Sequence, residues 1–161
     1  MTKTVYILVG PKGSGKTYIG ELLSRETSVH FLSVEPIWLS LQPDEDGWHK
    51  VEAAVDDALE EHDAIVIESL GLTSGFERMR DSLSRRHSVE YIRVLASLDA
   101  CLDRVRARDA SRQIPVSEDK VRQYNEMAAT VELSWSLTID NSGPADDDEI
   151  LKAFQPLLMK A

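Results

Sequence analysis

The chain has 161 residues, of which 42% are hydrophobic and 29% are charged, and its formal net charge is −10. This composition indicates a folded globular domain and excludes a disordered or collagen-like chain. No apolar run approaches the roughly 20 residues that a membrane span needs. The acidic balance argues against a nucleic acid partner, because phosphate binding needs a basic surface. No signal-peptide pattern opens the sequence and Cys101 has no second cysteine to pair with, so we expect a cytoplasmic protein with no membrane partner.

The first half of the chain alternates short apolar runs with helical patterns. Residues 4–9 are predicted to form a strand, residues 16–25 a helix, and residues 29–34 a weaker strand. Residues 41–49 contain Pro43, Gly47 and an acidic triplet, so we expect a loop there, followed by a helix over 51–59. Residues 64–67, Ala-Ile-Val-Ile, form the clearest buried strand.

The alternation continues in the second half. A helix is predicted over residues 76–83 and a strand over residues 89–95. Ser97 can cap a helix over 98–105, and after a break at residues 113–115, Ser117 can cap another helix that reaches residue 128. A last strand is expected over 133–139 and a last helix over 146–158.

The predicted strands are apolar on both faces, which favours a parallel sheet covered on both sides. The sequence therefore predicts a single α/β domain over residues 1–161. We expect a three-layer sandwich with a five-stranded, mainly parallel sheet and helices on both faces. Ligands of such sheets bind at the carboxyl ends of the strands.

The loop after the first strand carries the most specific motif. Residues 10–17 fit the pattern G-x-x-x-x-G-K-[ST] of phosphate loops without a departure. Backbone N–H groups and a helix N-terminus make an anion site there, Lys16 brings a full charge to the β- and γ-phosphates, and Thr17 offers a hydroxyl to Mg²⁺. We expect this loop to bind ATP with Mg²⁺ through Gly10, Pro11, Lys12, Gly13, Ser14, Gly15, Lys16, Thr17 and the adjacent Tyr18.

Glu68 follows the strand at residues 64–67. A carboxylate there lies beside the phosphate loop and can hold Mg²⁺ through water or take a proton from an acceptor hydroxyl. The segment Glu68-Ser69-Leu70-Gly71 also loosely resembles the Asp-x-x-Gly switch of GTPases. This second interpretation keeps a nucleotide switch open.

Three arginines, Arg104, Arg108 and Arg112, are spaced four residues apart. On a helix they would share one face, although the break at residues 113–115 suggests that Arg112 lies on a loop. Guanidinium groups can stack on adenine and spread the charge of a moving phosphoryl group. The alternative is a solvated basic face paired with Asp103 and Asp109. The turn after the last strand can meet a base edge through Asn141, Gly143 and Pro144, although Asp and Asn are ordinary turn residues.

These motifs resemble those of the compact P-loop kinases of small molecules, the group of adenylate, shikimate, gluconate and nucleoside kinases, over nearly the whole chain. The resemblance implies the sheet order 2-3-1-4-5 and a short lid over about residues 104–116, with Arg104, Arg108 and Arg112 as lid arginines that close over ATP. It also implies that Glu35, just after the second strand, contacts the acceptor and that Glu68 lies near Mg²⁺.

The chain departs from individual members of this group. Adenylate kinases carry Asp-Gly-Phe-Pro-Arg where this chain has Glu-Ser-Leu-Gly-Leu over residues 68–72, and the Gly-Gly-Gly run of shikimate kinases is missing. Residues 31–70 contain no arginine but contain Trp38 and Trp48, so a neutral polyol, nucleoside or amino compound suits this region. An anionic acceptor would depend on Arg78, Arg80 or the lid. Trp38 and Trp48 could stack on a base or sugar, although aromatic side chains lie more often in a core.

The leading hypothesis is transfer of a phosphoryl group from Mg·ATP to a hydroxyl of a small-molecule acceptor, by a monomer or a homodimer. The alternatives are a nucleotide-binding switch or slow NTPase, although the chain lacks the Asn-Lys-x-Asp of GTPases, and a scaffold that has lost the chemistry. In the leading hypothesis Lys16, Glu68, Arg108 and Arg112 are catalytic, and Glu35, Trp38, Glu68 and Gly71 contact the acceptor.

Overall fold

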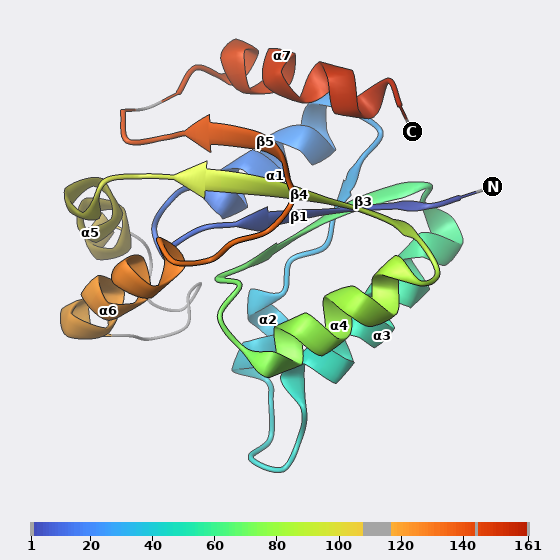
Figure 1. The fold of residues 1–161 in the computed structure, drawn as a ribbon, viewed down its shortest axis with the longest axis horizontal. Coiled ribbons are helices and arrows are strands. Elements are labelled where there is room, and N and C mark those ends of the chain that lie inside the picture. The colour runs from blue at the N-terminus through green and yellow to red at the C-terminus, as the bar shows by residue number, and fades with distance from the viewer. Residues whose placement is uncertain (1, 108–116, 144, 161) are drawn as a thin grey trace.

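A computed structural model describes residues 2–107, 117–143 and 145–160 of the chain (Figure 1). The described residues form a sheet of five strands with helices on both sides. The strands are β1 (Thr4–Val9), β2 (His30–Phe31), β3 (Ala64–Ser69), β4 (Ser88–Leu95) and β5 (Trp135–Asp140). The helices are α1 (Lys16–Glu26), α2 (Glu35–Leu39), α3 (Gly47–Glu61), α4 (Ser74–Ser84), α5 (Leu98–Ala107), α6 (Glu118–Ala128) and α7 (Asp147–Leu158).

The sheet has the order β2-β3-β1-β4-β5, and every neighbouring pair is parallel. Strand β1 lies in the centre, where Thr4 is opposite Ala64 of β3 on one side and Ser88 of β4 on the other. All six residues of β1 and all six of β3 are buried, as expected of strands covered on both faces. The predicted α/β fold and the order 2-3-1-4-5 are therefore confirmed.

The two faces of the sheet carry separate apolar clusters, because successive side chains of a strand point to opposite faces. Tyr6 and Leu8 of β1 belong to the cluster that contains side chains of α1 and α7. Val5, Ile7 and Val9 belong to the cluster that contains side chains of α3 and α4. Figure 1 shows the resulting three layers, with α1 and α7 on one side of the sheet and α3 and α4 on the other.

The structure corrects the predicted bounds between residues 29 and 49. Strand β2 has only two residues, and the chain then enters helix α2, which the sequence analysis did not predict. Helix α3 begins at Gly47, inside the segment expected to be a loop. Its start is fixed by the Asp46 carboxylate, which accepts hydrogen bonds from the backbone N–H groups of Trp48 and His49. The capping carboxylate of Asp46 therefore starts a helix within a segment whose composition is that of a loop.

Helices α5 and α6, which follow β4 in the chain, begin as predicted. The Ser97 hydroxyl accepts a hydrogen bond from the Ala100 N–H, and Ser117 does the same for Lys120. Strand β5 begins at Trp135, two residues later than predicted. The lid was predicted over about residues 104–116. Residues 104–107 form the end of helix α5, and the remainder, including Arg108 and Arg112, lies outside the described residues, as does Pro144. No helix in the described ranges is both long and apolar enough to cross a bilayer.

Candidate active site

The loop between β1 and α1 lies at the carboxyl edge of the central strand. The Gly10 N–H donates a hydrogen bond to the Ser69 carbonyl oxygen at 3.2 Å, which ties the start of the loop to the end of β3. Gly13 and Gly15 have φ angles of 84° and 98°, a left-handed conformation that glycine adopts without strain. The loop can therefore curve back on itself and present its N–H groups on the concave side.

Lys16 is held inside this curve. Its Nζ donates hydrogen bonds to the carbonyl oxygens of Gly10 at 2.8 Å and Pro11 at 2.9 Å, and the residue is 9% exposed. Burial lowers the pKa of Lys16 to about 8, although the Glu68 carboxylate opposes the decrease. The first turn of α1 contains no acidic residue that would neutralise the partial positive charge of the helix N-terminus. This partial charge therefore adds to the charge of the Lys16 ammonium group. The buried ammonium group and the helix N-terminus together make this loop suited to an anion.

A hydroxyl and a carboxylate meet beside the lysine. The Thr17 Oγ1 donates to the Glu68 carboxylate, 2.9 Å from Oε2 and 3.2 Å from Oε1, and Glu68 is 5% exposed. Hard oxygen donors of this kind suit Mg²⁺, which usually takes one or two protein ligands and completes its shell with water and phosphate oxygens. No group of three or more His, Cys, Asp or Glu side chains that could hold a metal occurs within the described ranges. The donor set therefore fits Mg²⁺ bound together with phosphate groups.

Two side chains from the second half of the chain brace the loop. Asn141, which follows β5, donates from Nδ2 to the Ser14 carbonyl oxygen at 2.9 Å. The guanidinium of Arg104 on α5 donates to the carbonyl oxygens of Gly13 at 3.2 Å and Asn141 at 2.6 Å. Arg104 and Asn141, both predicted to bind nucleotide, thus lie at the loop and contact its backbone carbonyls.

Helix α5 packs directly against the loop, which the sequence analysis missed. A Cβ atom added at Gly13 would lie 2.5 Å from the Cys101 carbonyl oxygen. Cys101 is fully buried, and burial raises the pKa of its thiol. The contact is made by backbone atoms of Cys101, so no side-chain pattern in the sequence could have revealed it.

The other predicted nucleotide-binding residues lie at the loop or near its edge. Pro11 and Ser14 are buried, and the Ser14 hydroxyl has no hydrogen-bond partner among the described residues. Lys12 is half-buried. The Tyr18 hydroxyl donates to the Asp147 carboxylate at 2.5 Å, so it links α1 to α7, and Gly143 is exposed. Their contacts with nucleotide remain predictions.

The predicted acceptor residues divide into two groups. Glu35, at the start of α2, and Glu68 both lie near enough to Lys16 to oppose the decrease in its pKa. Trp38 instead packs edge-on against Trp48, with ring centroids 5.1 Å apart, and belongs to the cluster under α3 and α4. Gly71 has a φ of 76° and follows β3. The acceptor roles of these residues remain predictions.

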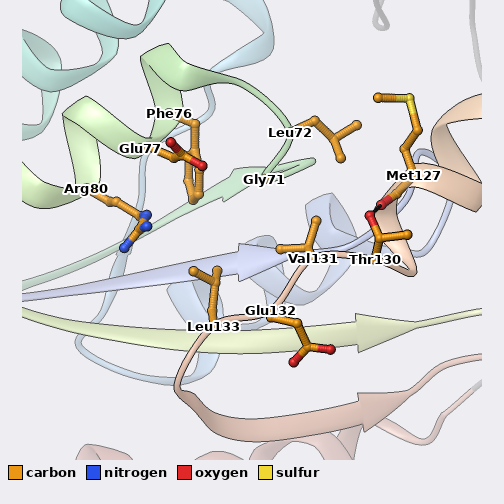
Figure 2. A pocket seen from close by; sticks show the side chains of 10 residues that line it. All are labelled: Gly71, Leu72, Phe76, Glu77, Arg80, Met127, Thr130, Val131, Glu132 and Leu133. Carbon is orange, nitrogen blue, oxygen red and sulfur yellow. Dashed lines mark hydrogen bonds between the residues drawn. The ribbon is translucent and has the colours of Figure 1, made fainter.

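A cavity of about 300 Å³ opens beside Gly71 (Figure 2). Helix α4 forms one wall, with Phe76, Glu77 and Arg80, and residues 127–133 form another. Of the predicted acceptor residues that the structure describes, Gly71 is the one that lines it. The sequence analysis had named Arg80 as a residue on which an anionic acceptor would depend, and the structure places it in the cavity wall.

The sequence matches no protein-family profile and no curated protein sequence. Solved structures do match. Shikimate kinase from Acinetobacter baumannii, in complex with shikimate, has a TM-score of 0.63 at 22% identity over 99% of this chain and 95% of that one. A sugar kinase from Janibacter sp. has a TM-score of 0.68 at 20% identity over 100% and 96%. A chain of the Pnkp1/Rnl/Hen1 RNA repair complex has a TM-score of 0.66 at 17% identity over 80% of this chain, which spans only 44% of that longer chain.

These likenesses extend over nearly the full length of the first two kinases, at identities that establish the fold and nothing finer. The order of the parallel sheet agrees with this fold. The chain therefore has the fold of the P-loop small-molecule kinases.

Proposed function

We propose that the protein transfers the γ-phosphoryl group of ATP to a hydroxyl of a small-molecule acceptor. The observation that carries this proposal is the group of Lys16, Thr17 and Glu68, three side chains from α1 and β3 that meet at one edge of the sheet. A cation for phosphate oxygens, a hydroxyl and a carboxylate are the parts that phosphoryl transfer needs from a protein.

The residues have separable tasks. Lys16 and the N–H groups of the loop bind and orient phosphate oxygens. Thr17 and Glu68 would hold Mg²⁺, which neutralises phosphate charge when bound. Arg104 and Asn141 fix the backbone of the loop through its carbonyl oxygens. Glu68 or Glu35 accepts the proton of the acceptor hydroxyl or orients that hydroxyl. We also propose that Arg108 and Arg112 stabilise the negative charge of the phosphoryl group during its transfer.

The test is release of ADP from ATP and Mg²⁺ in the presence of nucleosides, nucleoside monophosphates, sugar acids, polyols and aminoglycosides. We expect release that depends on one acceptor class and that falls by about 10²-fold or more in Lys16→Ala, because a preorganised charge at the phosphates is lost. Lys152→Ala, an exposed lysine on α7, is the matched control and should keep full turnover.

The same assay distinguishes the proposed kinase from a slow NTPase or a nucleotide switch. Slow release of ADP that no acceptor accelerates, still lost in Lys16→Ala, would support a slow NTPase or a nucleotide switch. Undiminished turnover in Lys16→Ala would refute the proposed mechanism.

A further inference from the structure

We propose that the stacked imidazole rings of His30 and His62 form a pH-sensitive latch that holds β2 on the edge of the sheet. Protonation of both rings opens the latch, and β2 then leaves the edge together with α2, the helix that begins at Glu35. The latch is a property of the fold beyond the proposed phosphoryl transfer, and it does not depend on that activity.

The two rings come from different elements. His30 is the first residue of β2, and His62 directly follows α3. Their centroids lie 4.1 Å apart and their planes differ by 2°, so the rings lie flat against each other, and both residues are half-buried. Two unit charges about 4 Å apart repel each other even in water, and more strongly at a partly buried site. The stack is therefore favourable only while at least one ring is neutral.

Little negative charge surrounds the pair to offset a second proton. Burial is the largest cause that lowers the pKa of His30 and the facing His62 is the next, whereas the Glu61 carboxylate opposes the decrease. Asp63, beside His62, already pairs with the Lys3 ammonium group at 2.7 Å. The two rings therefore resist double protonation as long as they stay stacked.

The elements packed against β2 do not supply the missing charge. Helix α1 covers the strand where a Cβ atom added at Gly20 would lie 2.6 Å from the Phe31 ring. The charged residues of α1 are Lys16, Glu21, Arg25 and Glu26. Neither these residues nor Glu68, the one titratable residue of β3, contribute to the shift in the pKa of His30.

His87 shows the kind of partner that would compensate a proton. Its Nε2 lies 3.4 Å from Oδ1 of Asp56, a carboxylate that can stabilise a charged ring. Within the described ranges, neither ring of the stacked pair has a carboxylate partner at such a distance. The two rings therefore bind protons more readily when β2 is released into water, and lowering the pH through the usual range of histidine titration favours the released state.

Strand β2 is weakly held apart from this contact. It pairs with β3 through two residues, His30 and Phe31, and it is the last strand on that side of the described sheet. The Leu32 N–H adds one hydrogen bond, to the Val66 carbonyl oxygen at 3.0 Å. Short edge segments open at a low cost in free energy, so repulsion between two rings can decide whether β2 stays on the sheet.

Helix α2 carries the change toward the phosphate loop. It begins at Glu35, shortly after β2 ends at Phe31, and the Glu35 carboxylate lies near enough to Lys16 to oppose the decrease in its pKa. Release of β2 removes the support of α2 and withdraws this carboxylate from Lys16. The protons are bound near the amino end of β3, where His30 is opposite Ile65, and their effect appears at the carboxyl ends of the strands.

Native-state amide exchange, measured by NMR between pH 7.5 and pH 5.0, tests the latch. The protection factor of the Leu32 amide should fall by about 10-fold or more over this range, which corresponds to a difference of one pKa unit or more between the held and released states. The amides of Ile7 in β1 and Ile67 in β3 are the reference and should lose clearly less protection. Unchanged protection of Leu32, or an equal loss at all three amides, would overturn the proposal.

Histidine variants assign the loss of protection to the stacked pair. His30→Phe keeps a flat ring against His62 but takes no proton, so the protection of Leu32 should change by less than about 2-fold over the same range. His30→Gln, which also takes no proton, should behave in the same way. His49→Gln replaces an exposed histidine on α3, is the matched control and should keep the full loss. A thermal melt at pH 7.5 checks the fold of each variant, and a loss in the folded His30 variants equal to that of the control would refute the role of the pair.

The indole N–H signal of Trp38 in α2 reports whether this helix moves with β2. Trp38 packs edge-on against Trp48, with ring centroids 5.1 Å apart, so its signal depends on this contact. We expect the signal to shift with the same midpoint as the imidazole signals of His30, and to stay constant in His30→Phe. A constant Trp38 signal in the wild type, while Leu32 loses protection, would refute the release of α2. None of these measurements uses nucleotide or acceptor, so failure of the proposed kinase activity would leave their results unchanged.

Discussion

The ammonium group of Lys16 lies buried in the loop between β1 and α1, and its burial predicts how stability depends on pH. Its pKa falls from the usual 10.5 to about 8 in the folded protein. Between these values the unfolded chain binds more protons at this group than the folded one, so the free energy of unfolding rises with pH. The penalty for burying the charge is complete below pH 8 and is relieved as the pH rises toward 10.5.

The measurement is urea unfolding of the wild type and of Lys16→Met at several pH values from 7.5 to 10.5. We expect the difference in free energy of unfolding, wild type minus variant, to increase by roughly 2–3 kcal/mol over this range, at about 1.4 kcal/mol per pKa unit. Other groups titrate in both proteins, so their effects cancel in the difference. A difference that does not change with pH would contradict the prediction.

The carboxylate of Glu68 is expected to be needed for turnover more than for stability. Glu68→Gln keeps the shape and the hydrogen bond from Thr17 but removes the charge that Mg²⁺ or an acceptor proton would need. We expect turnover to fall by about 10²-fold or more and to need a higher Mg²⁺ concentration, measured as ADP release in a Mg²⁺ titration. Glu60→Gln, an exposed acid on α3, serves as the control. A Mg²⁺ dependence equal to that of the control would rule out a metal role for Glu68.

Some site residues could be predicted from the sequence because their positions follow from local rules. Lys16 and Thr17 belong to a contiguous motif, and Glu68 follows a strand whose burial is evident from its composition. The position of Arg80 in the wall of the cavity could not be predicted in this way. Its surroundings include residues 127–133, which are about fifty positions away in sequence, and helix periodicity does not show which distant segment covers a helix face.

At the scale of elements, the contact between α5 and the phosphate loop depends on Gly13. Gly13→Ala would strain a backbone with φ 84° and would place a Cβ atom 2.5 Å from the Cys101 carbonyl oxygen. We expect a loss of about 1–3 kcal/mol in free energy of unfolding, together with weaker binding of ATP, because the loop and α5 must move apart. The measurements are urea unfolding and a nucleotide titration.

Gly143→Ala is the matched control for this prediction. Apart from its chain neighbours, no described residue has a heavy atom within 4 Å of the position that its Cβ would take, and its φ is not positive. It should therefore unfold within about 0.5 kcal/mol of the wild type. If both variants were equally stable, the close packing of α5 on the loop would not be a constraint in solution.

The elements that could be predicted are those with long, regular apolar patterns. Strands β1 and β3 and helix α1 lie where the sequence placed them, because both faces of a central strand and one face of an amphipathic helix are buried. Strand β2 and helix α2 could not be placed accurately. Strand β2 has two residues, which is too few to show an alternating apolar pattern in the sequence. The start of α3 depends on one capping carboxylate, Asp46.

At the scale of the whole molecule, the sheet divides the core into two clusters that share one set of strands. Phe154 of α7 lies in one cluster and Phe76 of α4 in the other, and both are almost completely buried. We expect Phe154→Ala and Phe76→Ala each to lower the free energy of unfolding by about 3–5 kcal/mol. Because β1 contributes to both clusters, each variant should still unfold in a single transition.

Urea unfolding followed by circular dichroism and by tryptophan fluorescence tests this expectation. Trp38 and Trp48 lie in the α3 and α4 cluster, so fluorescence reports mainly on that face, whereas circular dichroism reports on all helices. Coincident transitions in both variants would support one cooperative unit. A fluorescence transition that stays at the wild-type midpoint in Phe154→Ala, while the circular dichroism midpoint falls, would show that the two faces unfold separately.

The central position of β1 also bears on how the chain is made. Synthesis proceeds from the N-terminus, so this strand leaves the ribosome before its hydrogen-bonding partners at residues 64–69 and 88–95 exist. One edge of β1 stays unpaired until residues 64–69 have been translated, and the other edge until residues 88–95 have been translated. Parallel pairings between such distant segments form slowly, and an unpaired apolar strand is a site of aggregation. Nascent chains that end before β4 should therefore depend on chaperones, and slowing translation after β4 should improve the yield of folded protein more than slowing it before β3.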